Sequence, residues 1–413
     1  MDLSLGIGYN SLVWTRSGSE IYFDLDAGNP SPGFQFGFPT IEPIYFDEAK
    51  SKFAYMMVTT SGARVQFRET TVSGVYETAD SSYTQLVTTG ASNPNDPVEN
   101  ITITVKTTDG TQMKYEWKDG AFRCTQIKDR NGNYISATYD AYGLLQTVTD
   151  TLGRVITVSY NSDLYPTTIT QTWKDSNGAG ANVTHTWATF TYANMDGTNA
   201  TAFGTSFAGL TAIGPPNGTA LKVLQKITYA DGSSTKFDYN AYAQVYRVSN
   251  IAADLATHVL NSTEIDIASP SGPTDVPRFT STSTKAENFN NGNAVTVTNT
   301  VPAAAADYSL ATGISINSRV VKVGVAGHPD QLYTRVHYGG SGWKEGLTLA
   351  TEDCTDANDT CTTRQRWTRT DITQDDTGLA YILNPRVTES RVGDGTNTKR
   401  TTVSYYGASL FSL

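Results

Sequence analysis

Four histidines are the first residues that could support acid–base or metal chemistry in this chain. His185, His258, His328 and His337 are dispersed, and none belongs to an H-E-x-x-H or H-x-E arrangement, in which metal ligands and a general base are brought together. The sequence contains no P-loop and no G-x-S-x-G nucleophile elbow, which Gly204-Thr-Ser-Phe-Ala-Gly209 misses by one position. We therefore expect structural or surface histidines and a protein that is not an enzyme.

Two carboxylate pairs have the residue type that glycosidases use. They are Asp24 with Asp26 and Asp375 with Asp376. Adjacent strand residues face opposite sides of a sheet, and Asp375-Asp376-Thr-Gly378 has the composition of a turn. Neither pair is expected to be catalytic.

The loop between Cys354 and Cys361 is short and polar, and two interpretations of it stay open. A hairpin disulfide would imply an oxidising compartment and would leave Cys124 unpaired and buried. A calcium site is the alternative, although the loop lacks the full EF-hand ligand pattern. Its candidate ligands would be Asp353, Asp356 and Asp359.

Tryptophan side chains offer a further kind of site. Flat aromatic faces suit stacking on sugar rings, so surface tryptophans could form a carbohydrate-binding platform; the alternative is that they pack in the core. The candidates are Trp14, Trp173, Trp187, Trp343 and Trp367.

The elements that must position these side chains follow from an internal repeat. One 21-residue pattern occurs twice in succession, at 129–149 and 150–170, a third copy occupies 231–250, and a degenerate copy precedes the pair. Such self-similarity predicts structural units that pack on their neighbours. The equivalent residues are Gly132, Gly153 and Gly232; Tyr139, Tyr160 and Tyr239; and Asp140, Asn161 and Asn240.

Each copy has the pattern of two short strands and two turns. Ile135, Ala137 and Tyr139 alternate with polar residues, which predicts a strand with one apolar face that carries the tyrosine ring. The segments Asp140–Gly143 and Asp150–Gly153 end successive strands, because Asp bonds its own backbone and Gly accepts positive φ. We expect an antiparallel meander in which the Asp and Asn side chains bond local backbone amides and fix the register.

This pattern resembles the YD-repeat signature of the RHS family, a group of large bacterial surface and secreted proteins. The resemblance rests on Tyr139-Asp140, on Gly143-Leu144-Leu145 and on Asp150-Thr151-Leu152-Gly153-Arg154. It implies an all-β fold in which antiparallel β-hairpin repeats are wound into an extended sheet or a partial hollow β-shell. It also implies a structural role, in which the shell encloses or presents a toxin or adhesive polypeptide without catalysis or cofactor.

The family resemblance further implies partners and a location. The partner would be the remainder of the same longer polypeptide or an enclosed effector, and the protein would be secreted or at the cell surface, with export signals outside this chain. The alternative function is a carbohydrate-binding or adhesive module that binds cell-surface glycans. A net charge of −10, without a Lys/Arg cluster, argues against nucleic-acid binding, and no apolar stretch is long enough for a membrane span.

The composition and turn signals suggest three regions. With 23 Tyr and 35 Gly, the chain favours short strands and turns over helices, and Pro302 marks the one persuasive helix start. An N-terminal β region is expected at 1–100 and the YD-repeat region at 101–260, with an insertion of short strands and loops at about 171–221. A further strand-rich, degenerate repeat-like region is expected at 261–413.

Overall fold

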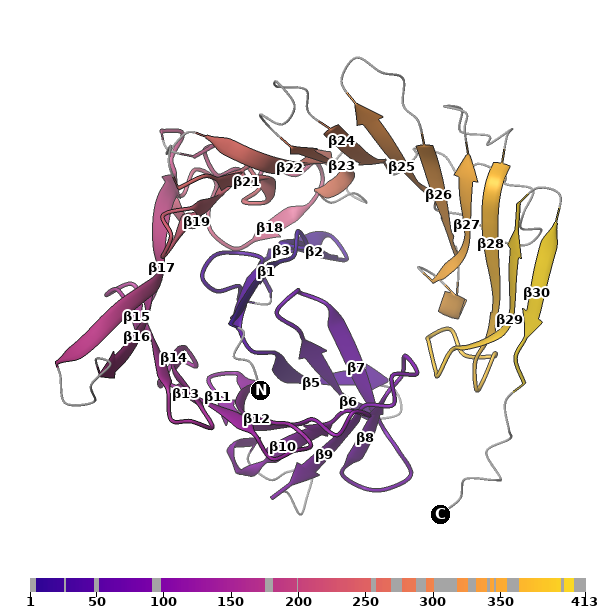
Figure 1. Cartoon of the computed structure of the whole chain (residues 1–413), viewed down its shortest axis with the longest axis horizontal. Helices are drawn as coiled ribbons and strands as arrows, with labels where there is room; N and C mark the ends of the chain where they lie inside the picture. Colours follow the sequence, from indigo (N-terminus) through magenta and orange to yellow (C-terminus); the bar gives the residue numbers. More distant parts are fainter. Residues whose placement is uncertain are drawn as a thin grey trace. The chain divides into compact units, whose positions relative to one another are not determined.

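A computed structural model describes most of the chain, which divides into two compact units (Figure 1). The described residues are 5–25, 27–47, 52–90, 98–174, 181–198, 200–253, 258–268, 277–286, 295–300, 318–325, 332–339, 342–344, 347–354, 364–394 and 397–404. The first unit comprises Met1–Val259 with Ala268–Arg278, and the second comprises Leu260–Ile267 with Phe279–Leu413. The predicted division at residue 260 falls within β22 (Val259–Ala268).

Both units are built from strands, which confirms the predicted all-β fold. Within the described residues the only helical elements are two 3-10 turns, η2 (Val98–Asn100) and η3 (Gly342–Lys344). The expected helix start at Pro302 lies outside the described residues. No helix of the described part is long and apolar enough to cross a membrane.

The first unit contains a closed antiparallel barrel of eight strands. They are β5 (Thr40–Asp47), β6 (Lys52–Val58), β7 (Arg64–Glu69), β8 (Val75–Thr78), β9 (Gln85–Thr89), β10 (Thr102–Lys106), β11 (Gln112–Lys118) and β12 (Ala121–Lys128). Neighbouring strands pair in chain order, and the barrel closes where Phe122 and Arg123 of β12 pair with Ile41 and Thr40 of β5. Its core consists of alternating apolar residues such as Phe67, Leu86, Ile103 and Tyr115.

The predicted boundary at residue 100 lies inside this barrel. β9 and β10 are hydrogen-bonded neighbours, from Thr89 opposite Thr102 to Gln85 opposite Lys106. Turn residues in Ser92–Pro97 suggested a boundary, but turn residues end a strand without determining which strands pair afterwards. Strands from both predicted regions, 1–100 and 101–260, therefore form one closed barrel.

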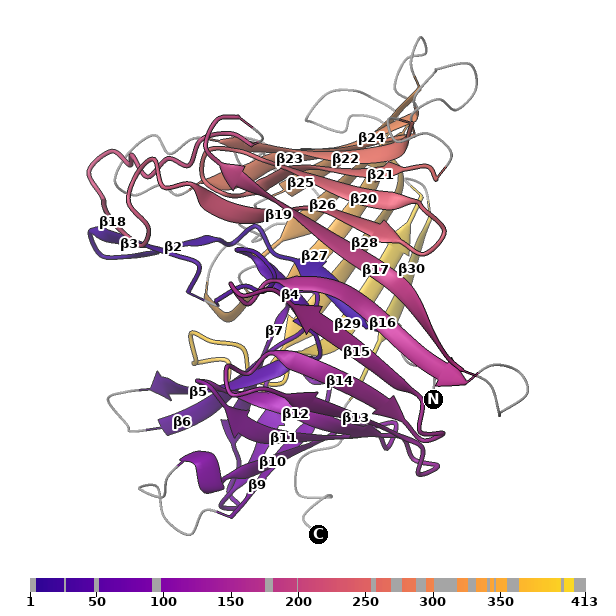
Figure 2. The ribbon, with the colours of Figure 1, turned by 90° about the vertical axis from the view of Figure 1, so that its left-hand side faces the viewer.

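A second run of strands continues from the barrel as an antiparallel meander (Figure 2). These are β13 (Tyr134–Tyr139), β14 (Leu145–Asp150), β15 (Val155–Tyr160), β16 (Pro166–Lys174), β17 (Asn182–Met195), β19 (Leu221–Tyr229), β20 (Ser234–Tyr239) and β21 (Val245–Ile251). The meander starts at β12, because Gln126–Lys128 pair with β13 whereas Phe122 and Arg123 pair with β5. One strand thus belongs to both the barrel and the meander.

The insertion expected at 171–221 is largely a part of this meander. β17 is a single strand of 14 residues that pairs with β16 along one edge and with β19 along the other. Thr, Val and aromatic residues fill it, and these side chains favour the extended backbone. Short strands and loops were expected for this insertion; β17 is longer than expected, whereas a short strand, β18 (Thr211–Ile213), occurs in the loop that follows.

The N-terminal segment forms two small sheets that are separate from the meander. β1 (Gly6–Tyr9) pairs with β4 (Phe34–Gly37), and β2 (Trp14–Ser17) pairs with β3 (Glu20–Phe23), which also pairs with β18. Figure 1 shows these strands within the curve of the meander. Trp14, Ile21 and Phe34 belong to the same buried cluster as residues from β17, β19, β20 and β21.

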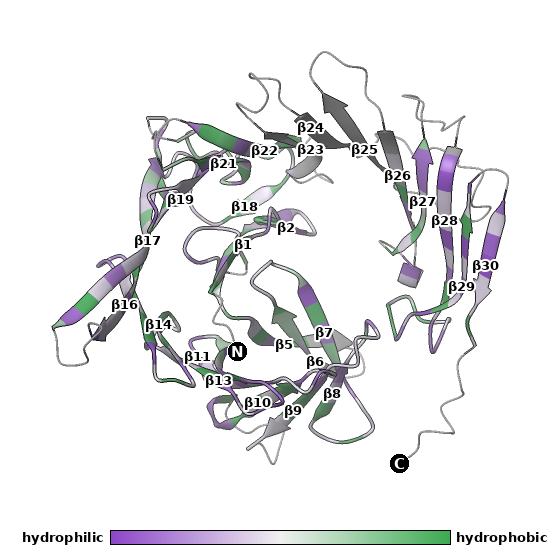
Figure 3. Cartoon of the chain, viewed as in Figure 1, coloured by the Kyte–Doolittle hydropathy of each residue, from purple (hydrophilic) through white to green (hydrophobic). Residues whose placement is uncertain are grey.

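The second unit is an antiparallel run of its own. After β22 come β23 (Arg278–Ala286), β24 (Val295–Thr300), β25 (Ser318–Val325), β26 (Leu332–Tyr338), β27 (Thr348–Cys354), β28 (Arg364–Thr373), β29 (Arg386–Gly393) and β30 (Thr398–Thr402). From β23 onward each strand pairs with the next. Figure 3 shows that β28 and β30 are mainly hydrophilic, in keeping with their many Arg and Thr residues.

Candidate functional site

The recurring tyrosines make the same contact in each repeat copy. Every phenol donates a hydrogen bond to a backbone carbonyl fifteen residues earlier, and every tyrosine follows a β-bulge. The O···O distances are 2.9 Å from Tyr139 to Cys124, 2.8 Å from Tyr160 to Leu145 and 2.6 Å from Tyr239 to Leu224. Burial raises the pKa of all three phenols. Each of these side chains therefore links its strand to the preceding strand.

The Asp and Asn residues after the tyrosines organise the turns. Asp140 Oδ1 accepts hydrogen bonds from the amides of Tyr142 and Leu144, both at 2.9 Å. Asn161 bonds the amides of Asp163 and Tyr165 in the same way, and Asn240 bonds those of Tyr242 and Gln244. Each side chain thus satisfies two turn amides, which is why Asn can replace Asp here.

The turn before the tyrosine-bearing strand of each copy is a four-residue turn that ends in Gly. Gly132, Gly153 and Gly232 have φ values of 89°, 77° and 86°, in the left-handed region. Asp150 opens the central turn of this type, with Arg154 Nε donating to its Oδ2 at 2.6 Å. That hydrogen bond is the main reason why the pKa of Asp150 lies below its usual value.

The cysteine loop is described only at its first end. Cys354 is fully buried at the end of β27 and is disulfide-bonded, whereas its predicted partner, Cys361, lies outside the described residues. Asp356 and Asp359 also lie outside, and Asp353 accepts a hydrogen bond from Thr334. Within the described residues no group of three or more His, Cys, Asp or Glu could hold a metal ion. Cys124 is a buried free thiol whose pKa is raised by burial to about 12.

The other catalytic candidates are held in local structural contacts. Asp24 accepts hydrogen bonds from the amides of Gly28 and Gly33, and Asp376 accepts one from Gly378. Asp375 pairs with Arg386. Asp26 and His328 lie outside the described residues.

Two histidines lie in defined surroundings. His337 Nε2 lies 3.0 Å from Glu352 Oε2, and both side chains are buried in the second unit. His185 stands between Trp173 and Trp187, with ring centroids 6.0 Å and 4.4 Å away. The sequence shows the histidines but not these neighbours.

Tryptophans divide between core and surface. Trp14 is 2% exposed and donates its indole N–H to the Tyr242 carbonyl at 2.8 Å. Trp173 and Trp187 are 43% and 46% exposed, on the β16–β17 hairpin. In the second unit, Trp343 lies under the ammonium of Lys344, and Trp367 lies so close to Gly393 that a Cβ there would be 2.4 Å from the indole.

The inner face of the meander holds the N-terminal segment by polar and aromatic contacts. The Val245 amide donates to Tyr9 Oη at 2.8 Å, and Gln244 Nε2 donates to the Ser11 carbonyl at 2.9 Å. Phe34 packs edge-on against Phe237, with ring centroids 5.1 Å apart. This face therefore binds an extended stretch of polypeptide from far away in the sequence.

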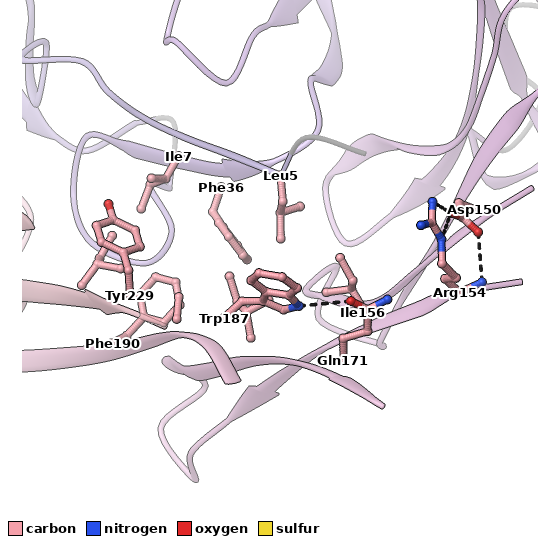
Figure 4. Close-up of a pocket in the computed structure, with 13 residues that line it drawn as sticks. Leu5, Ile7, Phe36, Asp150, Arg154, Ile156, Gln171, Trp187, Phe190 and Tyr229 are labelled. Atoms are coloured by element: carbon pink, nitrogen blue, oxygen red, sulfur yellow. Dashed lines mark hydrogen bonds and ion pairs between the residues drawn. The ribbon is translucent and has the colours of Figure 1, made fainter. Parts of the chain in front are cut away.

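A pocket of about 540 Å³ lies beside that segment (Figure 4). Leu5, Ile7 and Phe36 line it from the N-terminal segment. The meander contributes Ile156, Ile169, Trp187, Ala188, Phe190, Ile227 and Tyr229, and polar groups come from Asp150, Arg154 and Gln171. Trp187 Nε1 donates to Gln171 Oε1 at 3.2 Å, so one edge of the indole is fixed while the ring stays half-exposed.

The hairpin that carries Trp187 extends past its neighbours. β15 pairs with β16 as far as Gln171, and β19 pairs with β17 only from Ala188 onward, so residues 172–174 and 182–184 pair only with each other. Trp173, Val183 and His185 lie on the face that also carries Trp187, whereas Thr172 and Thr184 bond each other on the opposite face. Of the tryptophans considered for an aromatic platform, Trp173 and Trp187 share this one face, and Trp187 also lines the pocket.

Comparisons with known proteins give similarity only to solved structures. No family model matches this chain, and no curated protein matches it. The crystal structure of TcdB2-TccC3-Cdc42 is similar over 87% of this chain and 18% of that chain, with 12% identity and a TM-score of 0.35. The structure of TcdB2-TccC3 is similar over 87% of this chain and 22% of that chain, with 12% identity and a TM-score of 0.20. The structure of TcdB2-TccC3-TEV is similar over 84% of this chain and 22% of that chain, with 10% identity and a TM-score of 0.15. The chain therefore spans no more than 22% of the length of these chains.

Proposed function

We propose that this chain is a structural segment of an exported RHS-like protein, part of a β-shell that encloses or presents another polypeptide and performs no catalysis itself. The observation that carries the proposal is the N-terminal segment on the inner face of the meander. Its strands do not join the wound sheet but pair among themselves and with β18. The inner face thus accommodates an extended polypeptide through side-chain pockets.

The contacts with this segment have the chemistry that a lining for a polypeptide needs. Aromatic side chains of the sheet pack against two phenylalanines of the segment. Phe237 contacts Phe34, and Phe190 contacts Phe36 with ring centroids 5.8 Å apart. Gln244 and the Val245 amide supply hydrogen bonds to groups of the segment. Large aromatic contacts with a few fixed polar partners dominate polypeptide recognition.

Surface remains open next to the bound segment. The pocket between Phe36 and Trp187 and the adjoining hairpin face expose apolar area that the segment does not cover. We propose that a second stretch of polypeptide, from the same longer protein or from an enclosed effector, lies there. The proposal includes a secreted or cell-surface location, which the disulfide at Cys354 supports because such bonds persist in oxidising compartments.

Site-specific photo-crosslinking tests the proposal. Benzoylphenylalanine replaces Trp187 on the inner face or Thr184 on the opposite face of the same strand, in the exported protein as cells make it. We expect cross-linked peptides from a polypeptide segment outside residues 1–413 at position 187 and none at position 184. Equal cross-linking at both positions, or none at position 187, would exclude the enclosing role.

A carbohydrate-binding function is the second candidate, favoured by Trp187 in particular. Its indole is fixed by Gln171 and half-exposed beside the paired Asp150 and Arg154, and an aromatic face with polar groups at its edge suits a sugar ring. A glycan array with the native protein, Trp187→Ala and the opposite-face control Thr184→Ala separates the two functions. Reproducible glycan binding that only Trp187→Ala abolishes would favour the carbohydrate-binding module.

A further inference from the structure

A crevice opens in the first unit where β12 changes partners. Phe122 and Arg123 pair with β5, and Gln126–Lys128 pair with β13, so the two partner strands diverge on the same edge of β12. A cavity of about 440 Å³ lies here. Its lining includes Glu42 of β5, Arg123 of β12 and Tyr139 of β13, together with residues 25 and 27–29 and the β13–β14 turn.

Arg123 is the unusual residue of this crevice. Its Nε is enclosed without a hydrogen-bond partner, and among the described residues its guanidinium has no ion pair. Desolvation lowers its pKa, and electrostatic interactions with Tyr139, Asp119 and Glu42 act against that shift. Arg123 as a whole is partly exposed, but an enclosed guanidinium N–H without a hydrogen-bond partner costs free energy, so packing alone does not explain it.

The other repeat copies show which residues occupy the position equivalent to Arg123. Arg123 immediately precedes Cys124, whose carbonyl accepts the Tyr139 hydrogen bond. In the other two copies the residues before the accepting carbonyls are Leu144 and Val223. An apolar side chain therefore meets the structural need of the repeat, and only the copy at the crevice has a cation.

Gly143 provides a second, independent sign that the site is built around Arg123. The equivalent positions are Leu164 and Ala243, with φ of 67° and 58° against 67° for Gly143, so the turn does not require glycine. A Cβ at position 143 would lie 3.1 Å from Arg123 Nε and 3.3 Å from Nη2. The missing side chain makes room for the guanidinium.

We propose that Arg123 binds a carboxylate group of a ligand in this crevice. The planar guanidinium matches a carboxylate with two parallel hydrogen bonds, which neither Asp119 nor Glu42 supplies in this structure. Asp119 lies on an exposed turn, where water screens its charge. The site does not depend on the proposed shell function, because it uses a different cavity from the Trp187 pocket.

Calorimetric titration with matched probe pairs tests this site on the full chain at neutral pH. A blocked Ala-Asp-Ala peptide and its Ala-Asn-Ala analogue test a side-chain carboxylate. A tripeptide with a free C-terminus and its amide test a terminal carboxylate, and glucuronate and glucose test an acidic sugar. We expect at least one carboxylate probe to bind at least tenfold more tightly than its neutral twin, and the pair concerned identifies the source.

Variants assign that preference to Arg123. Arg123→Leu introduces the residue found at position 144; it should abolish the preference and keep or raise the thermal unfolding midpoint, because it removes a desolvated charge. Gly143→Ala should weaken carboxylate binding at least tenfold by displacing the guanidinium. Gly153→Ala is the matched control, since it adds a Cβ at positive φ with nothing within 4 Å, and it should bind normally.

Three results would overturn the inference. One is a native protein that does not distinguish carboxylate probes from neutral ones. Another is a preference that survives Arg123→Leu. The third is an Arg123→Leu variant that unfolds at a clearly lower temperature or fails to fold, since Arg123 would then be a structural residue.

Discussion

Removal of the Tyr139 side chain tests whether the repeat tyrosine is a structural residue. Tyr139→Phe deletes only the hydroxyl that donates to the Cys124 carbonyl at 2.9 Å, which we expect to cost about 1–2 kcal/mol. Tyr139→Ala also removes a ring that packs on the cluster of Ile135, Ala137 and Val148, and it should cost about 3–4 kcal/mol. Tyr142→Ala, at a 59% exposed tyrosine in the adjacent turn, should change stability by less than about 0.5 kcal/mol.

Native-state hydrogen exchange, read on peptides from β12 to β14, measures these costs where they arise and avoids a global unfolding model for a chain of two units. The expected order of destabilisation is Tyr139→Ala, then Tyr139→Phe, then Tyr142→Ala. Binding at the Trp187 pocket by the folded variants should be unchanged, because neither Tyr139 nor Tyr142 lines that pocket. If Tyr139→Ala were as stable as the native protein but lost binding to a sugar or protein ligand, the structural role of the repeat tyrosine would be refuted.

Further predictions concern the core, the acid range and the thiols. Trp14→Ala should destabilise the first unit by about 3–5 kcal/mol in urea unfolding, whereas Trp173→Ala, at a half-exposed ring, should cost less than half as much. The pKa of Asp150 is lower in the folded than in the unfolded chain, so its contribution to folding stability is present above the unfolded pKa and is lost as the pH falls through the folded pKa. The Asp150→Asn variant should lose this part of the acid sensitivity, measured as unfolding at decreasing pH. It should still form the turn, because Asn161 and Asn240 support equivalent turns. Cys124 should resist alkylation in the folded protein. In the unfolded protein, one thiol should react with the alkylating agent when no reductant is present, and all three should react after reduction. Reaction of all three thiols without reductant would exclude a disulfide.

The sequence alone was sufficient for the local structure of the repeats. Alternation around Ile135 and Ala137 predicts a half-buried strand, and Asp140 with Gly143 predicts the turn that follows, because both depend on residues within a few positions of one another. The meander from β13 to β16 follows from these local rules, as each strand pairs with its predecessor across a short turn. The all-β class required nothing more.

Tertiary structure alone decided the features that depend on distant pairing. β12 pairs with both β5 and β13, and no local pattern indicates that Ile41 lies opposite Phe122. That divergence places Arg123 in a crevice, whereas the sequence does not distinguish it from the other polar residues of the strand. The N-terminal segment and Trp187 come together in the same way, because burial of apolar surface is non-directional and does not specify which distant segment supplies the cover.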